Sequence, residues 1–202
     1  MMSMIGSASG AKGPDAAVWR VDGGEVTVET AAYRARFSGA GLVELTNLVT
    51  GESYLEDARV ARRTSVAATW GERLYEDASV TVKKTEDGVE ILLMRPDESE
   101  AGRGIRLSVD ALTGDLLIRH WGRVDRPGLT ALRWGLHVDT SKADVIIPGR
   151  SNGFALRAGD DWPSTFVELP WPMSWHAAVV IVQGEFGGFR IWADDDDFHM
   201  KS

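Results

Sequence analysis

Apolar and polar residues alternate one by one over several stretches of this chain. Every second residue is apolar in 33–37, 105–109 and 132–138. Successive side chains of a β-strand point to opposite faces of a sheet, so this period predicts half-buried antiparallel strands. Turn signals such as Thr50-Gly51 separate the stretches. The pattern therefore predicts an all-β chain.

The expected strands are short and numerous. Their approximate positions are 18–21, 25–30, 32–38, 42–48, 64–70, 78–84, 89–94, 105–110, 115–121, 130–138, 144–148, 177–183 and 188–193. The best candidate for a helix, residues 56–63, spans only about two turns. Many short strands with little helix are typical of sandwiches and barrels, and this number is too large for an immunoglobulin domain. We expect a large two-sheet antiparallel β-sandwich, or supersandwich, with little helix.

The 202 residues are enough for one large domain. No linker rich in Pro, Ser or Gly interrupts the pattern, so we expect a single β-sandwich domain over residues 14–202. Residues 1–13 are small and polar apart from Ile5 and three methionines. We expect them to form a flexible N-terminal tail.

Charge and composition exclude several classes of partner. The chain has 22 basic and 30 acidic residues, a net charge of −8 and no Lys/Arg cluster, so we expect neither nucleic acid nor an anionic membrane as a partner. It has no cysteine, which excludes thiol catalysis, thiolate metal ligands and disulfides. No apolar run reaches the roughly 18 residues of a membrane span, and no secretory signal is present. We expect a soluble protein, either cytoplasmic or secreted with its signal removed.

Residues 149–176 interrupt the succession of hairpins. This expected loop carries three tryptophans and three prolines: Trp162, Trp171, Trp175, Pro163, Pro170 and Pro172. Long loops without periodicity are uncommon in compact domains and are often functional. Two interpretations stay open, because the rings either cap one end of the core or face a ligand.

The second interpretation defines a candidate carbohydrate site. The apolar face of a sugar ring packs on flat aromatic rings, while its hydroxyl groups need carboxylate, guanidinium or imidazole partners. The candidate platform is Trp162, Trp171 and Trp175, and the candidate hydroxyl partners are Arg150, Asp161, Glu168 and His176. If the rings instead form an exposed apolar patch, the isolated chain is expected to bury it in a two-fold homodimer.

No motif in the sequence identifies a catalytic or cofactor site. The histidines lack metal-site spacing; they are His120, His137, His176 and His199. His176 with Glu168 or Glu185 is the first pair to examine as general acid and base, against the simpler interpretation of isolated surface histidines. The carboxylates at 194–197 have two interpretations, a Ca²⁺ site and a solvated charge run, and the lack of EF-hand spacing favours the second. A G-x-S-x-G elbow, a P-loop and a dinucleotide fingerprint are absent, so we expect no cofactor, no metal and no catalytic residue.

Several stretches carry a resemblance to a known family. Residues 33–37 read Y-R-A-R-F, and residues 42–52 read L-V-E-L-T-N-L-V-T-G-E. Together they resemble the opening strands of the galactose-mutarotase-like supersandwich that precedes the catalytic barrel in several glycoside hydrolase families. There, Y-x-x-x-F, a glycine turn and L-x-x-L-x-N-x-x-T-G are typical. The aromatic-proline stretch through Trp175, with residues 178–182 and 187–194, resembles the end of the same domain.

The resemblance implies a function. It implies a non-catalytic, carbohydrate-associated β-sandwich domain of a glycoside hydrolase, which frames or binds a sugar. It also implies that the chain is a fragment of a longer one, with a C-terminal catalytic barrel as its partner, and that it is not active alone. Two alternatives stay open: a self-sufficient sugar mutarotase or epimerase on the same architecture, and a purely structural interaction module. A histidine and a glutamate facing each other across one pocket would distinguish the enzyme.

Overall fold

The computed structural model of the chain describes residues 2–5, 17–56, 66–70, 73–75, 79–94, 102–122, 129–134, 136–147, 153–160 and 179–193. These residues form strands and turns but no helix. In particular, this part of the chain contains no helix with the length and apolar character needed to cross a bilayer. The all-β class expected from the alternation is therefore confirmed.

The described residues form sixteen strands. They are β1 (Met2–Ile5), β2 (Val18–Asp22), β3 (Glu25–Glu29), β4 (Tyr33–Ser38), β5 (Gly41–Asn47), β6 (Val66–Trp70), β7 (Arg73–Tyr75), β8 (Ser79–Lys84), β9 (Gly88–Met94), β10 (Arg103–Val109), β11 (Leu116–Gly122), β12 (Leu129–Trp134), β13 (Asp144–Ile147), β14 (Phe154–Leu156), β15 (Val179–Gln183) and β16 (Gly188–Trp192). Every strand expected from the sequence corresponds to one of these. The expected strand 130–138 ends early, because β12 stops at Trp134 and Val138 forms only an isolated bridge with Leu55.

The sequence does not predict β1, β7 and β14. β7 and β14 have three residues each, too few for an alternation to be recognised. Because β14 lies within 149–176, that stretch is not a loop throughout. The expected flexible tail is also wrong for Met2–Ile5, whose backbone pairs with β16 along its length and with β11 at Met2. Residues 6–13 and the candidate helical residues 57–63 lie outside the described part of the chain.

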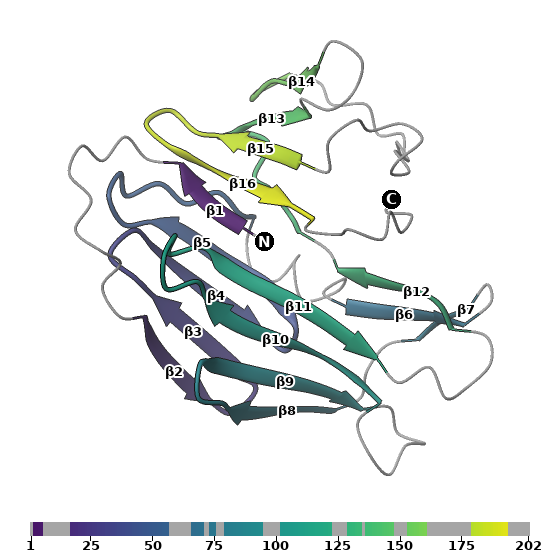
Figure 1. The fold of residues 1–202 in the computed structure, drawn as a ribbon. Coiled ribbons are helices and arrows are strands. Elements are labelled where there is room, and N and C mark those ends of the chain that lie inside the picture. Colours follow the sequence, from purple (N-terminus) through teal and green to yellow (C-terminus); the bar gives the residue numbers. More distant parts are fainter. Residues whose placement is uncertain are drawn as a thin grey trace.

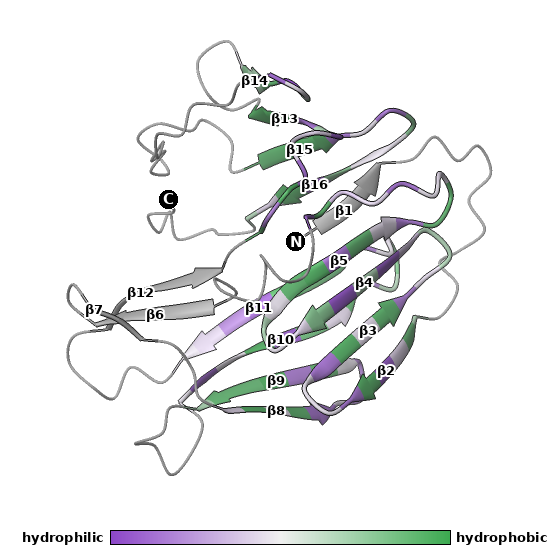
Figure 2. Ribbon diagram, turned by 180° about the vertical axis from the view of Figure 1, so that it is seen from behind, coloured by the Kyte–Doolittle hydropathy of each residue, from purple (hydrophilic) through white to green (hydrophobic). Residues whose placement is uncertain are grey.

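The strands form three antiparallel sheets. The largest has nine strands in the order β14-β13-β15-β16-β1-β11-β10-β9-β8, and a second is the four-stranded meander β2-β3-β4-β5. The third, β12-β6-β7, is small and was not expected. The two opposite views in Figures 1 and 2 both show β2–β5 overlying β8–β11. The two larger sheets therefore make the expected sandwich.

The core lies between these two sheets. The four-stranded sheet contributes Val26, Val28, Ala35, Phe37, Leu42 and Leu45, and the nine-stranded sheet contributes Val89, Ile91, Leu93, Ile105, Leu107, Leu116, Val182 and Phe189. Each of these side chains is at most 3% exposed. Alternating hydrophobic and hydrophilic bands along β3–β5 are visible in Figure 2. A bulge between Arg36 and Phe37 lets Phe37 pair with Leu42, so that both Leu42 and Leu45 face the core.

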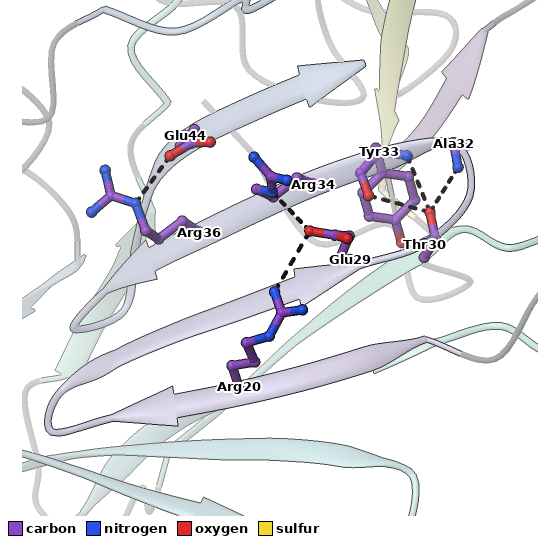
Figure 3. A network of polar contacts seen from close by, with 8 residues as sticks. All are labelled: Arg20, Glu29, Thr30, Ala32, Tyr33, Arg34, Arg36 and Glu44. Carbon is purple, nitrogen blue, oxygen red and sulfur yellow. Dashed lines mark hydrogen bonds and ion pairs between the residues drawn. The ribbon is translucent and has the colours of Figure 1, made fainter. Parts of the chain in front are cut away.

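The outer face of the four-stranded sheet carries matched charges (Figure 3). Glu29 lies 2.9 Å from Nε of Arg34 and 3.6 Å from Nη1 of Arg20, while Nε of Arg36 lies 3.1 Å from Glu44. The hydrogen bond from Arg34 lowers the pKa of Glu29. Exposed ion pairs of this kind add little to stability. This face is therefore a solvated surface on which these arginine side chains are paired with glutamates.

Candidate functional site

The residues of the resemblance in 42–52 build a hydrogen-bonded turn after β5. Asn47 is only 2% exposed. Its Oδ1 accepts the N–H groups of Val49 at 2.9 Å and Thr50 at 3.2 Å, and its carbonyl accepts the N–H of Gly51 at 2.8 Å. The asparagine therefore satisfies the backbone of its own turn.

Glu52 ties this turn to the turn between β15 and β16. Its Oε2 accepts the hydroxyl groups of Thr50 at 2.9 Å and Tyr54 at 3.1 Å, and its Oε1 accepts the N–H of Phe186 at 3.0 Å. Burial alone would raise the pKa of Glu52, but these hydrogen bonds outweigh it and the pKa lies below its usual value. Together with Asn47, these residues form the Glu52 network. These hydrogen bonds hold the turn after β5 against the turn between β15 and β16, which is a structural role.

The described part of the chain includes two clefts that could hold a small ligand. One, of about 410 Å³, is lined by Glu52 and Lys142 among others. The carboxylate of Glu52 already accepts the hydrogen bonds of its network, and Nζ of Lys142 lies 2.7 Å from Asp139. The other, of about 360 Å³, is lined by Trp19 and Asp110 among others. Oδ1 of Asp110 accepts two backbone N–H groups at 2.8 Å, so it caps a turn. Neither cleft is lined by a histidine.

The outer face of the nine-stranded sheet differs from both clefts. The register places four charged residues in one row across β8, β9, β10 and β11: Lys83, Glu90, Arg106 and Arg119. Core residues Ile105 and Leu107 flank Arg106 in its strand, so the row faces away from the sandwich core. Glu90 lies 3.4 Å from Nη2 of Arg106, whereas Arg106 and Arg119 stand directly opposite each other.

Trp121 lies beside this row on the same face. Its cross-strand partner is Gly104, and ring atoms Cε2 and Cζ2 of Trp121 lie 3.1 Å from the position that a Cβ at residue 104 would take. The glycine thus leaves room for the indole to lie against the sheet. Among the residues that the structure describes, the buried Nε1 of Trp121 has no hydrogen-bond partner. Such a donor is rare in folded proteins.

A second tryptophan occupies the same face on β16. Phe189 and Ile191 point to the core, so Arg190 and Trp192 point outward, and the guanidinium of Arg190 lies 4.5 Å from the centre of the Trp192 ring. Met2 of β1 pairs with both Leu116 and Ile191. With about 4.8 Å between strands and 3.4 Å per residue, this register separates Trp121 and Trp192 by about 16 Å.

We call this surface the tryptophan–arginine face: Glu90, Arg106, Arg119, Trp121, Arg190 and Trp192. Both rings are half-buried, and the three guanidinium groups are exposed. Flat rings bind the C–H faces of sugars, and guanidinium groups with a carboxylate bind hydroxyl groups around the ring.

The residues chosen from the sequence lie elsewhere in the chain. The proposed carbohydrate residues Arg150, Asp161, Trp162, Glu168, Trp171, Trp175 and His176 all lie outside the residues that the structure describes, as do His199 and the run 194–197. Glu185 is described and exposed in the turn after β15. His120 lies on the opposite face of β11 from Arg119, since it pairs with core residue Ile105.

Sequence reasoning missed the tryptophan–arginine face. Its signal in the sequence is weak, because residues 116–121 read L-L-I-R-H-W and do not alternate cleanly between apolar and polar side chains. Among the described residues, no group of three or more carboxylate or imidazole side chains is arranged to hold a metal ion. Comparison of the chain with protein-family models, with curated proteins and with solved structures found no significant match.

Proposed function

We propose that this chain is a non-catalytic β-sandwich domain that binds a carbohydrate on the tryptophan–arginine face. The resemblance in 33–37 and 42–52 extends the proposal to an accessory domain of a glycoside hydrolase. The observation that carries it is the presence of Trp121, Arg119 and Arg106 on one outer sheet surface beside Glu90. The rings supply apolar platforms, and the charged groups supply hydrogen bonds to hydroxyl groups.

The contrast between the two outer faces supports this choice. On the four-stranded sheet, Arg20, Arg34 and Arg36 each have a carboxylate partner, and no tryptophan faces outward among the described residues. On the nine-stranded sheet, two tryptophans point outward and two arginines face each other. Two half-buried tryptophan rings on an outer sheet face are more than a surface needs in order to be solvated, and Gly104 leaves room for one of them.

The spacing of the rings indicates the size of the ligand. The two indoles are separated by about 16 Å, which a single sugar ring cannot bridge. We therefore propose an oligosaccharide that contacts Trp121 and extends toward Trp192.

The test is titration of the chain with a panel of neutral and acidic oligosaccharides, followed by tryptophan fluorescence. We expect saturable quenching for at least one of them. Trp121→Ala should weaken that binding roughly ten-fold, as expected for the loss of a ring contact of about 1–1.5 kcal/mol. Trp121→Phe keeps an aromatic platform and should retain most of the affinity.

Trp19→Phe is the matched control, because Trp19 packs against the core side of β2 and not on this face. It should change the fluorescence but not the affinity. Melting curves of each variant show whether the fold is kept. A chain that binds none of the sugars at millimolar concentration, or a folded Trp121→Ala variant with unchanged affinity, would remove the basis of the proposal.

A further inference from the structure

The row of charges that begins at Lys83 and crosses the tryptophan–arginine face has more cations than anions. From β8 to β11 its members are Lys83, Glu90, Arg106 and Arg119, so that three cations accompany one anion. Glu90 lies between Lys83 and Arg106 in the register and makes its ion pair with Arg106 at 3.4 Å. Within the part of the chain that the structure describes, Arg119 has no ion pair, and β1 does not continue the row, since it meets β11 only through Met2 and Leu116.

The pairing of Arg106 with Arg119 works against the fold. Directly opposed side chains on antiparallel strands have Cβ atoms about 5 Å apart, and like charges in this position are destabilising. The whole chain carries a net charge of −8, so a concentration of cations in one row is a local departure from its composition. Departures from local rules of stability are expected where a surface serves a ligand.

We infer that the carbohydrate bound on the tryptophan–arginine face is acidic, with a uronic acid carboxylate seated between Arg106 and Arg119. This inference rests on the proposed function and names its class of ligand. Two guanidinium groups this close can share one carboxylate, and the planar guanidinium matches its two oxygens. Trp121, two residues beyond Arg119, lies about 7 Å along the strand, which places a platform for the sugar ring beside the charge.

Charge complementarity also separates this ligand from nucleic acid. Single-stranded nucleic acid also stacks on aromatic rings, but its binding depends on a positively charged groove that follows many phosphates. The row offers three cations with one carboxylate among them in an acidic chain, which suits an isolated carboxylate better than a phosphate backbone.

The experiment compares α-1,4-linked trigalacturonate with the uncharged galactotriose of the same linkage, by calorimetry on the whole chain. We expect trigalacturonate to bind at least ten-fold more tightly at low salt, with this preference falling in 0.5 M NaCl. Arg119→Ala should remove most of the preference, because it should weaken trigalacturonate binding several-fold more than galactotriose binding. Without ligand, Arg119→Ala should melt no lower than the wild type, because it removes a repulsion.

Arg20→Ala is the matched control, because Arg20 is an exposed arginine on the outer face of the opposite sheet, with 63% of its side chain accessible. It should leave both affinities unchanged. Equal binding of the acidic and neutral sugars would overturn this inference and leave the proposed function standing, whereas binding of no sugar would overturn both. Tighter binding of an oligothymidylate than of trigalacturonate would also overturn the inference, since the face would then recognise phosphate.

Discussion

Replacing Glu52 by alanine tests whether the Glu52 network fastens the β15–β16 turn to the body of the sandwich. The substitution removes the acceptor of three hydrogen bonds, from Thr50, Tyr54 and Phe186. Their contributions differ because their exposure differs. Phe186 is 69% exposed, so water can replace the carboxylate at its N–H, whereas Tyr54 is 1% exposed and its hydroxyl would remain buried without that acceptor.

The expected loss follows from these exposures. A buried donor left without its acceptor costs about 1–3 kcal/mol, and a hydrogen bond to a charged group contributes about 1.5–3 kcal/mol. We expect Glu52→Ala to lower the free energy of unfolding by about 2–3 kcal/mol. For a chain of this length that corresponds to a melting temperature lower by about 5–10 °C.

The assay is thermal and urea unfolding, followed by circular dichroism, of a double-mutant cycle with Tyr54→Phe. Removing the tyrosine hydroxyl first should reduce the cost of Glu52→Ala, with a coupling of about 1 kcal/mol. Glu185→Ala is the control, because Glu185 lines the same cleft but its side chain is exposed. A Glu52→Ala variant as stable as Glu185→Ala, within about 0.5 kcal/mol, would refute the reasoning.

Two further predictions concern acid pH and close packing. Because the pKa of Glu52 is lowered in the folded state, its charge contributes stability above the unfolded value of about 4.3 and loses it as the pH falls through the folded value. The advantage of wild type over Glu52→Gln in urea unfolding should therefore shrink below about pH 4, and an advantage independent of pH would contradict this. Gly104→Ala should cost about 1–3 kcal/mol, since its Cβ would run into the carbonyl of Ile91 and press on the Trp121 ring. Gly24→Ala, with no atom within 4 Å of its Cβ, is the comparison, and equal melting temperatures for the two variants would argue against that packing.

Most strands of this chain were predictable because they carry their own evidence, whereas β1, β7 and β14 do not. In 33–38, the pleat sends Tyr33, Ala35 and Phe37 to the core and their neighbours to solvent, so the period alone identifies both strand and face. The hairpin between β10 and β11 is local too, and its register sets Arg106 opposite Arg119. The alternation of apolar and polar residues does not show which distant segment packs against a strand or turn. The contact between Glu52 and Phe186 joins residues 134 positions apart and leaves no trace in either segment.

The site was harder to predict for a related reason. A tryptophan in a Trp/Pro-rich stretch such as 162–175 is conspicuous, whereas Trp121 lies inside an ordinary strand. Its importance depends on which face of β11 is buried, and therefore on which sheet covers it. Likewise, Trp192 comes to share a surface with Trp121 only because β1 lies between β16 and β11. Sequence analysis readily finds aromatic residues that are close together in the sequence, whereas the residues of this face are far apart along the chain.

The position of β1 has a consequence for the order in which the protein can assemble. Met2–Ile5 leave the ribosome long before Gly188–Trp192, yet the two segments are neighbours in the finished sheet. The nine-stranded sheet therefore remains in two parts, β13–β16 and β8–β11, until one of the most distant contacts in the chain is made. Forming such contacts is slow because the entropy of closing the intervening chain is lost first. During that interval β11 and β16 both present open edges, and a fusion or deletion at residues 2–5 would prolong their exposure and favour aggregation.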